Sequence, residues 1–94
     1  YRLGAHTVVV REGIARLGEH GSLAGSTLTL ERAVQVAHRC GVLLPAVLRA
    51  ATATPASAIG EHQVGDLEIG SFADVVRLDA DLAVTAVWSR GTLL

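Results

Sequence analysis

The stretch Gly65–Leu94, GDLEIGSFADVVRLDADLAVTAVWSRGTLL, consists of turns and strands and decides the fold class. Its first part, Gly65–Gly70, is rich in turn residues, because glycine and aspartate favour tight turns. The β-branched and aliphatic residues of Ala73–Asp79 and Leu82–Ser89 predict two strands, joined by a turn at Asp79–Asp81. A two-stranded unit is marginally stable by itself, so we expect this piece to depend on packing against other parts of the protein.

Three helices are predicted before these strands, between residues 29 and 60. The first follows Thr29, which has the character of an N-cap, and ends at Gly41, where a left-handed residue is favoured. Apolar residues recur between them at helical spacing. Pro45 suits the first turn of a second helix over Pro45–Ala53, and a short third helix covers Thr54–Gly60.

The chain begins with a predicted β-hairpin over residues 1–17, in which Thr7–Arg11 and Ile14–Leu17 flank a turn at Glu12–Gly13. A loop over residues 21–28, GSLAGSTL, connects the hairpin to the helices. Glycine lacks a Cβ, and Ser and Thr bond to their own backbone, so this composition suits either a lead-in to a helix or a backbone that comes close to a ligand. From the residues alone both interpretations stay open.

Composition excludes several classes of function. The net charge is −1 and the eight basic residues, all Arg, are scattered, so we expect no binding to nucleic acid or to a membrane surface. One cysteine, no long apolar run and no leader-like start indicate a reduced, cytoplasmic protein. Half of the residues are hydrophobic but only three are aromatic, which predicts aliphatic faces buried against more chain or another subunit, and hence a homo-oligomer.

Residues in three places carry a family resemblance. The C-terminal frame of Gly65, Gly70 and Ala73–Val76, closed by VWSRG, resembles the end of amidohydrolase-superfamily enzymes. LAGSTLTLERAV and VLRAATATPASAIG, which precede it in this order, are similar to the C-terminal part of the N-acetylglucosamine-6-phosphate deacetylase family within that superfamily.

The resemblance implies an α/β fold in which the chain is a C-terminal fragment of a (β/α)8 metal-dependent hydrolase barrel plus strands of a small composite β-sandwich. Residues 1–60 would be the end of the barrel domain, made of the hairpin 1–17, a substrate-lining loop 21–28 and the helices 29–60. Residues 61–94 would be strands of the sandwich. Leu23, Ala24 and Gly25 would line the site of the phosphorylated amino sugar, mostly through main-chain groups.

The resemblance also implies that the chemistry lies elsewhere. The family hydrolyses an amide with a divalent metal, zinc or iron, and its His and Glu ligands and catalytic Asp would all precede Tyr1. The four histidines of this chain have no ligand spacing, so we assign it no metal ligand and no catalytic residue; they are His6, His20, His38 and His62. We therefore expect the isolated chain to be inactive.

The acidic residues of the C-terminal third are expected to be structural. Asp74 would belong to a turn or cap, and Asp79 and Asp81 to the hairpin turn. Two alternatives stay open: a non-catalytic, self-associating α+β interaction module, or the C-terminal part of another amidohydrolase such as a dihydroorotase-like enzyme. The sequence also leaves open whether the sugar would be acetylglucosamine or acetylgalactosamine.

Overall fold

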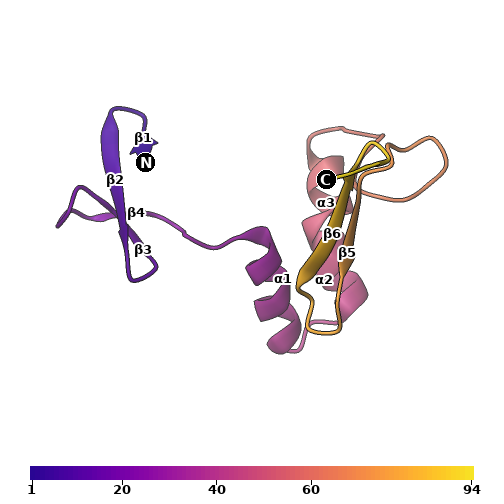
Figure 1. Cartoon of the computed structure of the whole chain (residues 1–94), viewed down its shortest axis with the longest axis horizontal. Coiled ribbons are helices and arrows are strands. Elements are labelled where there is room, and N and C mark those ends of the chain that lie inside the picture. The colour runs from indigo at the N-terminus through magenta and orange to yellow at the C-terminus, as the bar shows by residue number, and fades with distance from the viewer.

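Two lobes joined by an extended segment make up the computed structural model, which describes residues 1–94 (Figure 1). The N-terminal lobe is an antiparallel sheet with the strand order β1-β2-β3-β4. Its strands are β1 (Arg2–Leu3), β2 (His6–Arg11), β3 (Ile14–Leu17) and β4 (Leu23–Gly25). The C-terminal lobe contains a second antiparallel sheet, β5-β6-β7, beside three helices. Its elements are α1 (Leu30–Arg39), α2 (Leu44–Ala51), α3 (Ala53–Ala58), β5 (Val75–Leu78), β6 (Val84–Ser89) and β7 (Thr92–Leu93).

The predicted N-terminal hairpin is confirmed as β2 and β3, which pair from Val8↔Leu17 to Arg11↔Ile14. Both turn residues have a positive φ, 52° at Glu12 and 76° at Gly13. Left-handed backbone at both central positions is the geometry whose twist matches that of two antiparallel strands. One face of the pair carries Val8 and Ala15, which are 2% and 0% exposed.

The prediction of a loop over residues 21–28 was wrong in one respect, because this segment contains the strand β4. This strand pairs with β3 through Ala15↔Gly25 and Arg16↔Leu23, with a bulge between Ala15 and Arg16. Three residues flanked by glycine and serine give too short a pattern to be recognised as a strand. The added strands β1 and β4 turn the expected hairpin into a four-stranded sheet.

The helical region follows the sequence pattern, with shifted boundaries. Thr29 caps α1, since its backbone is extended and its Oγ1 accepts a hydrogen bond of 3.2 Å from the Arg32 N–H. Pro45 lies in the first turn of α2. The second and third helices begin and end one or two residues before the predicted boundaries because the backbone breaks at Thr52, whose φ and ψ of −130° and −81° are not helical.

The C-terminal hairpin is also confirmed, with Asp79 at its turn. One Asp79 carboxylate oxygen accepts hydrogen bonds of 2.9 Å from the N–H groups of both Asp81 and Ala83. The expectation of at most two strands was wrong: β7 pairs with the end of β6 through Trp88↔Leu93 and Ser89↔Thr92. The turn between β6 and β7 was overlooked because only two residues of β7 form the ladder.

Little of the chain is buried. Five of the 94 residues are buried: Val8, Ala15, Val34, Val47 and Ala56. The accessible surface is 7177 Å², where a folded monomer of this mass would expose about 5,200 Å². The radius of gyration is 16.5 Å, against about 12 Å for a compact domain of this length. The surplus surface agrees with the aliphatic faces that the composition predicted.

An apolar groove of about 930 Å³ accounts for part of that surface. It lies between the helices α2 and α3 and the strands β5 and β6 and is lined mainly by hydrophobic side chains, among them Leu48, Ile59, Val76 and Trp88. The β5–β6 hairpin is held beside α1 by a polar contact. The Gln35 side chain donates a hydrogen bond of 3.2 Å to the Leu82 carbonyl. None of the three helices has the length and apolarity that crossing a bilayer requires.

The loop before β5 depends on one carboxylate, which gives a testable pH dependence. The Ser71 hydroxyl, at 2.5 Å, and the Glu68 N–H both donate to Asp66, and these hydrogen bonds hold the Asp66 pKa below its ordinary value of 3.8. Because the folded pKa is depressed, the stabilisation is present above pH 4 and is lost as the pH falls through the folded pKa.

We expect Ser71→Ala to raise the Asp66 pKa toward 3.8, because it removes the stronger of the two donors. An NMR titration of the Asp66 carboxyl carbon measures this directly. Ser57→Ala, on α3 and without a hydrogen bond to Asp66, is the matched control. An Asp66 pKa unaffected by Ser71→Ala would show that the hydroxyl does not hold the loop.

Candidate functional site

The edge strand β4 is the part of the molecule that the sequence singled out. Leu23 is 67% exposed, Gly25 is exposed and Ala24 is half-buried. As the last strand of its sheet, β4 bonds to β3 along one side only, so its other side offers main-chain N–H and C=O groups without a strand partner. Such an edge can hydrogen-bond a polar ligand through main-chain atoms.

A tight turn between β3 and β4 holds this edge in place. The Leu17 N–H donates to the Ser22 carbonyl at 2.9 Å, and the Gly18 N–H donates to the Thr7 carbonyl at 2.8 Å. A Cβ at Gly21 would lie 1.8 Å from the Leu17 carbonyl oxygen, so only glycine fits this turn. The sequence analysis singled out Gly25 and overlooked Gly21. Glycine is required at position 21 because of a close contact across the turn, which the sequence does not show.

The segment after β4 is tied back to the hairpin. The Thr27 hydroxyl donates to the Gly13 carbonyl at 2.6 Å, and Ser26 Oγ accepts from the Leu28 N–H at 3.0 Å. Around Gly25 itself the chain leaves room, since nothing would lie within 4 Å of an added Cβ. The open position and the anchored flanks together make β4 a fixed, accessible edge.

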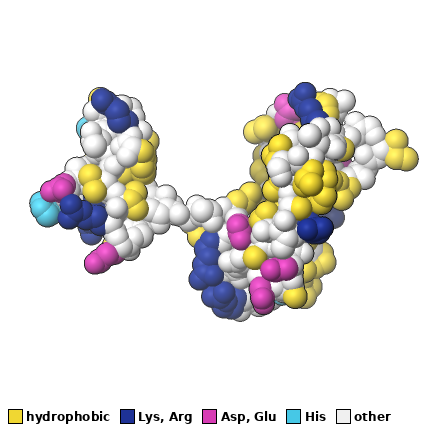
Figure 2. All heavy atoms as spheres, in the orientation of Figure 1, with side chains coloured by type: hydrophobic (Ala, Val, Ile, Leu, Met, Phe, Trp, Pro, Cys, Tyr) yellow, Lys and Arg dark blue, Asp and Glu magenta, His cyan; other side chains and the backbone are white.

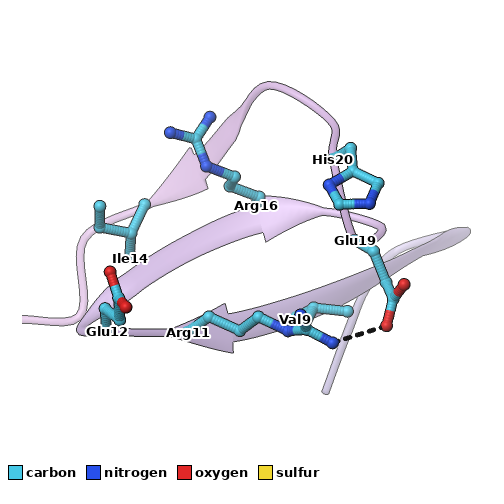
Figure 3. A pocket seen from close by; sticks show the side chains of 7 residues that line it. All are labelled: Val9, Arg11, Glu12, Ile14, Arg16, Glu19 and His20. Carbon is cyan, nitrogen blue, oxygen red and sulfur yellow. Dashed lines mark hydrogen bonds and ion pairs between the residues drawn. The ribbon is translucent and has the colours of Figure 1, made fainter.

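A shallow hollow of about 610 Å³ lies on one face of the same sheet (Figure 3). Its lining residues are Val9, Arg11, Glu12, Ile14, Arg16, Glu19 and His20. Arg11 and Glu19 form an ion pair at 2.7 Å, and Arg16 donates to the Gly21 carbonyl at 3.2 Å. In Figure 2 the charged and histidine side chains of this lobe gather on the side turned away from the helices, and hydrophobic ones on the side turned toward them.

Within residues 1–94, no group of three or more His, Cys, Asp or Glu side chains is arranged to hold a metal ion. His20 lies on the hollow and His38 Nδ1 lies 3.0 Å from the Val42 carbonyl. Asp74 has the structural role that was expected, because its carboxylate accepts a hydrogen bond of 2.8 Å from the Arg90 N–H.

Comparison with known proteins identifies relatives along the whole chain. It is 38% identical, over 96 aligned positions, to an N-acetylglucosamine-6-phosphate deacetylase from Vibrio furnissii, covering 100% of this chain and 24% of the relative. It is 46% identical over 87 positions to an N-acetylgalactosamine-6-phosphate deacetylase from a Shewanella species, covering 92% of this chain and 22% of the relative. No family model matches the chain.

Solved structures similar to this chain are deacetylases of the same kind. An N-acetylglucosamine-6-phosphate deacetylase from Pasteurella multocida superimposes with a TM-score of 0.85 and 28% identity, covering 100% of this chain and 25% of that one. A mutant of the Mycobacterium smegmatis enzyme, in complex with N-acetyl-D-glucosamine-6-phosphate, superimposes with a TM-score of 0.80 and 39% identity, covering 99% of this chain and 26% of that one.

Sequence and fold thus make this chain homologous to deacetylases of phosphorylated amino sugars. More narrowly, it corresponds to a C-terminal part of the N-acetylglucosamine- and N-acetylgalactosamine-6-phosphate deacetylases. The chain spans about a quarter of the length of the Vibrio and Shewanella relatives. Its own architecture is α/β, with two small antiparallel sheets and three helices.

Proposed function

We propose that the chain forms the C-terminal portion of a cytoplasmic amide hydrolase that converts N-acetylglucosamine 6-phosphate and water to glucosamine 6-phosphate and acetate. The observation that carries this proposal is the superposition of both lobes together on one deacetylase, over 100% of the chain at a TM-score of 0.85. Two lobes with so little contact superimpose together, in one arrangement, on a part of a larger enzyme, and this supports the proposal.

In that enzyme, residues 1–60 would close the (β/α)8 barrel and residues 61–94 would contribute strands to a small β-sandwich. The surplus surface supports this assignment, because the groove between α2, α3 and β5–β6 would be covered by chain outside residues 1–94. The divalent metal, zinc or iron, and the proton-transferring Asp would also belong to that other part, which supplies the chemistry of amide hydrolysis.

The part of the substrate site that this chain would supply is the β4 edge. Leu23, Ala24 and Gly25 would face the phosphorylated amino sugar, with main-chain groups bonding its polar atoms. A small side chain at position 24 and none at position 25 keep the edge accessible. The role of the chain in catalysis would be to bind and orient the substrate.

N-acetylgalactosamine 6-phosphate is the second candidate substrate. It is favoured by the 46% identity to the Shewanella enzyme, which exceeds the 38% identity to the Vibrio enzyme. The two sugars differ in the orientation of one hydroxyl group. Main-chain groups at an edge could bond either orientation, so the choice would depend on the whole site.

A chimera tests the proposal. We expect the Vibrio furnissii deacetylase with its matching C-terminal quarter replaced by residues 1–94 to release acetate from N-acetylglucosamine 6-phosphate, within about tenfold of the parent rate. The same enzyme without a C-terminal quarter, and residues 1–94 alone with added zinc, should release none. Rates with the two acetylated sugars compare the candidate substrates. A folded chimera without activity on either sugar would overturn the proposal.

A further inference from the structure

Thr27 lies just beyond the end of β4 and reaches back to the turn between β2 and β3. Its hydroxyl donates a hydrogen bond of 2.6 Å to the Gly13 carbonyl, 14 residues earlier in the chain. Ser26, by contrast, accepts a hydrogen bond from the Leu28 N–H, within its own segment. Among the side-chain hydrogen bonds of residues 26–28, the bond from Thr27 is therefore the one that joins this segment to the sheet.

The strand register explains why Thr27 meets Gly13. Strands β3 and β4 are antiparallel, and Ala15 pairs with Gly25. When this register is continued toward the turn, position 27 falls opposite position 13, where the ladder itself has already ended. The Thr27 hydroxyl thus supplies a hydrogen bond at the place where the ladder supplies none.

The acceptor of this hydrogen bond belongs to a well-defined turn. Glu12 and Gly13 both have left-handed backbone, which matches the twist of the two strands that they join. At the other end of β4, the Leu17 N–H bonds to the Ser22 carbonyl at 2.9 Å. The edge strand is therefore anchored on both sides, before β4 by a main-chain bond and after β4 by the side chain of Thr27.

We propose that Thr27 is a positioning residue for the phosphorylated amino sugar, an inference that rests on the proposed function of the β4 edge. The Thr27 hydroxyl fixes the path of the main chain after Gly25, so that the N–H and C=O groups of β4 keep one orientation toward the sugar. Without this bond the segment is free to follow the extended chain that leads to α1 (Figure 1). Thr27 acts through the main chain of Ala24 and Gly25 and does not itself contact the sugar.

Isosteric replacement in the Vibrio chimera tests this role. Thr27→Val keeps the shape of the side chain and removes the donor, so KM for the acetylated sugar phosphate should rise about fivefold or more while kcat stays within about threefold. Thr27→Ser keeps the hydroxyl and should hold KM within about twofold of the unmodified chimera. Thr92→Val, on β7 and without a side-chain hydrogen bond, is the matched control and should leave both constants unchanged.

Hydrogen exchange of residues 1–94 gives a second readout that needs no substrate. In Thr27→Val the amides of β4 should exchange about fivefold faster or more, whereas the amides of β2 should keep their protection. Unchanged exchange in β4, or an active chimera whose Thr27→Val variant keeps its KM, would overturn the role of Thr27 alone. An unmodified chimera without activity would instead overturn the proposed function and, with it, the link from Thr27 to the sugar.

Discussion

Replacing Gly21 by alanine is expected to disrupt the β3–β4 turn and to release the β4 edge. The new Cβ would lie 1.8 Å from the Leu17 carbonyl oxygen and 2.9 Å from the Leu17 carbonyl carbon. These are backbone atoms of the preceding strand, so no side-chain rotation can relieve the overlap. The cost should be about 3 kcal/mol or more, in the range of strongly destabilising substitutions.

Hydrogen exchange measured by NMR resolves this effect locally. The Leu17 amide, which donates across the turn to Ser22, should lose its protection in Gly21→Ala, while the amides of α1 stay protected. Gly25→Ala is the matched control, because nothing lies within 4 Å of the added Cβ and the φ of Gly25 is not positive. Equal protection of Leu17 in both variants would show that the turn relaxes without cost.

Gly25→Val should impair substrate binding in the active chimera, with the Michaelis constant for the acetylated sugar phosphate raised at least tenfold. The isopropyl group would extend from the β4 edge into the space proposed for the ligand. Within this chain the substitution meets no neighbour, and valine favours strand conformation. The chain should therefore stay folded, and the higher KM should come from a clash between the valine side chain and the ligand.

The kinetic pattern distinguishes lost binding from lost chemistry. A raised KM with kcat within about threefold indicates an interaction made equally in the ground and transition states, which fits a residue that only lines the site. Gly25→Ala should give a smaller increase in KM, in proportion to its smaller side chain. Unchanged KM and kcat in Gly25→Val would mean that β4 is a structural edge and contacts no substrate.

Local sequence signals were sufficient where neighbours along the chain decide the structure. Thr29 caps α1, Pro45 begins α2, and Asp79 closes the β5–β6 turn with its own carboxylate. In each case the bonding groups lie within a few residues of each other, so the residue type predicts the conformation. The strands β4 and β7 were overlooked because two or three residues give no periodicity to read.

The candidate site was predicted only in part. The sequence singled out Leu23–Gly25, and the structure places these residues on an accessible edge strand. The β3–β4 turn requires glycine at position 21, because a Cβ there would overlap the Leu17 carbonyl on the other side of the turn. The hollow with Glu12 and Arg16 was not foreseen either, because side chains share a face only once the β2–β3 register is fixed.

The sequence by itself determined the helices, the two hairpins, the aliphatic composition and the family resemblance, because these depend on residue type and local spacing. Only the tertiary structure decided that β4 is an edge, that the two lobes barely touch and that Arg11 pairs with Glu19. Strand neighbours, exposed faces and charge pairs are relations between residues brought together by folding. Because only five of the 94 residues are buried, most of these relations lie on exposed surface.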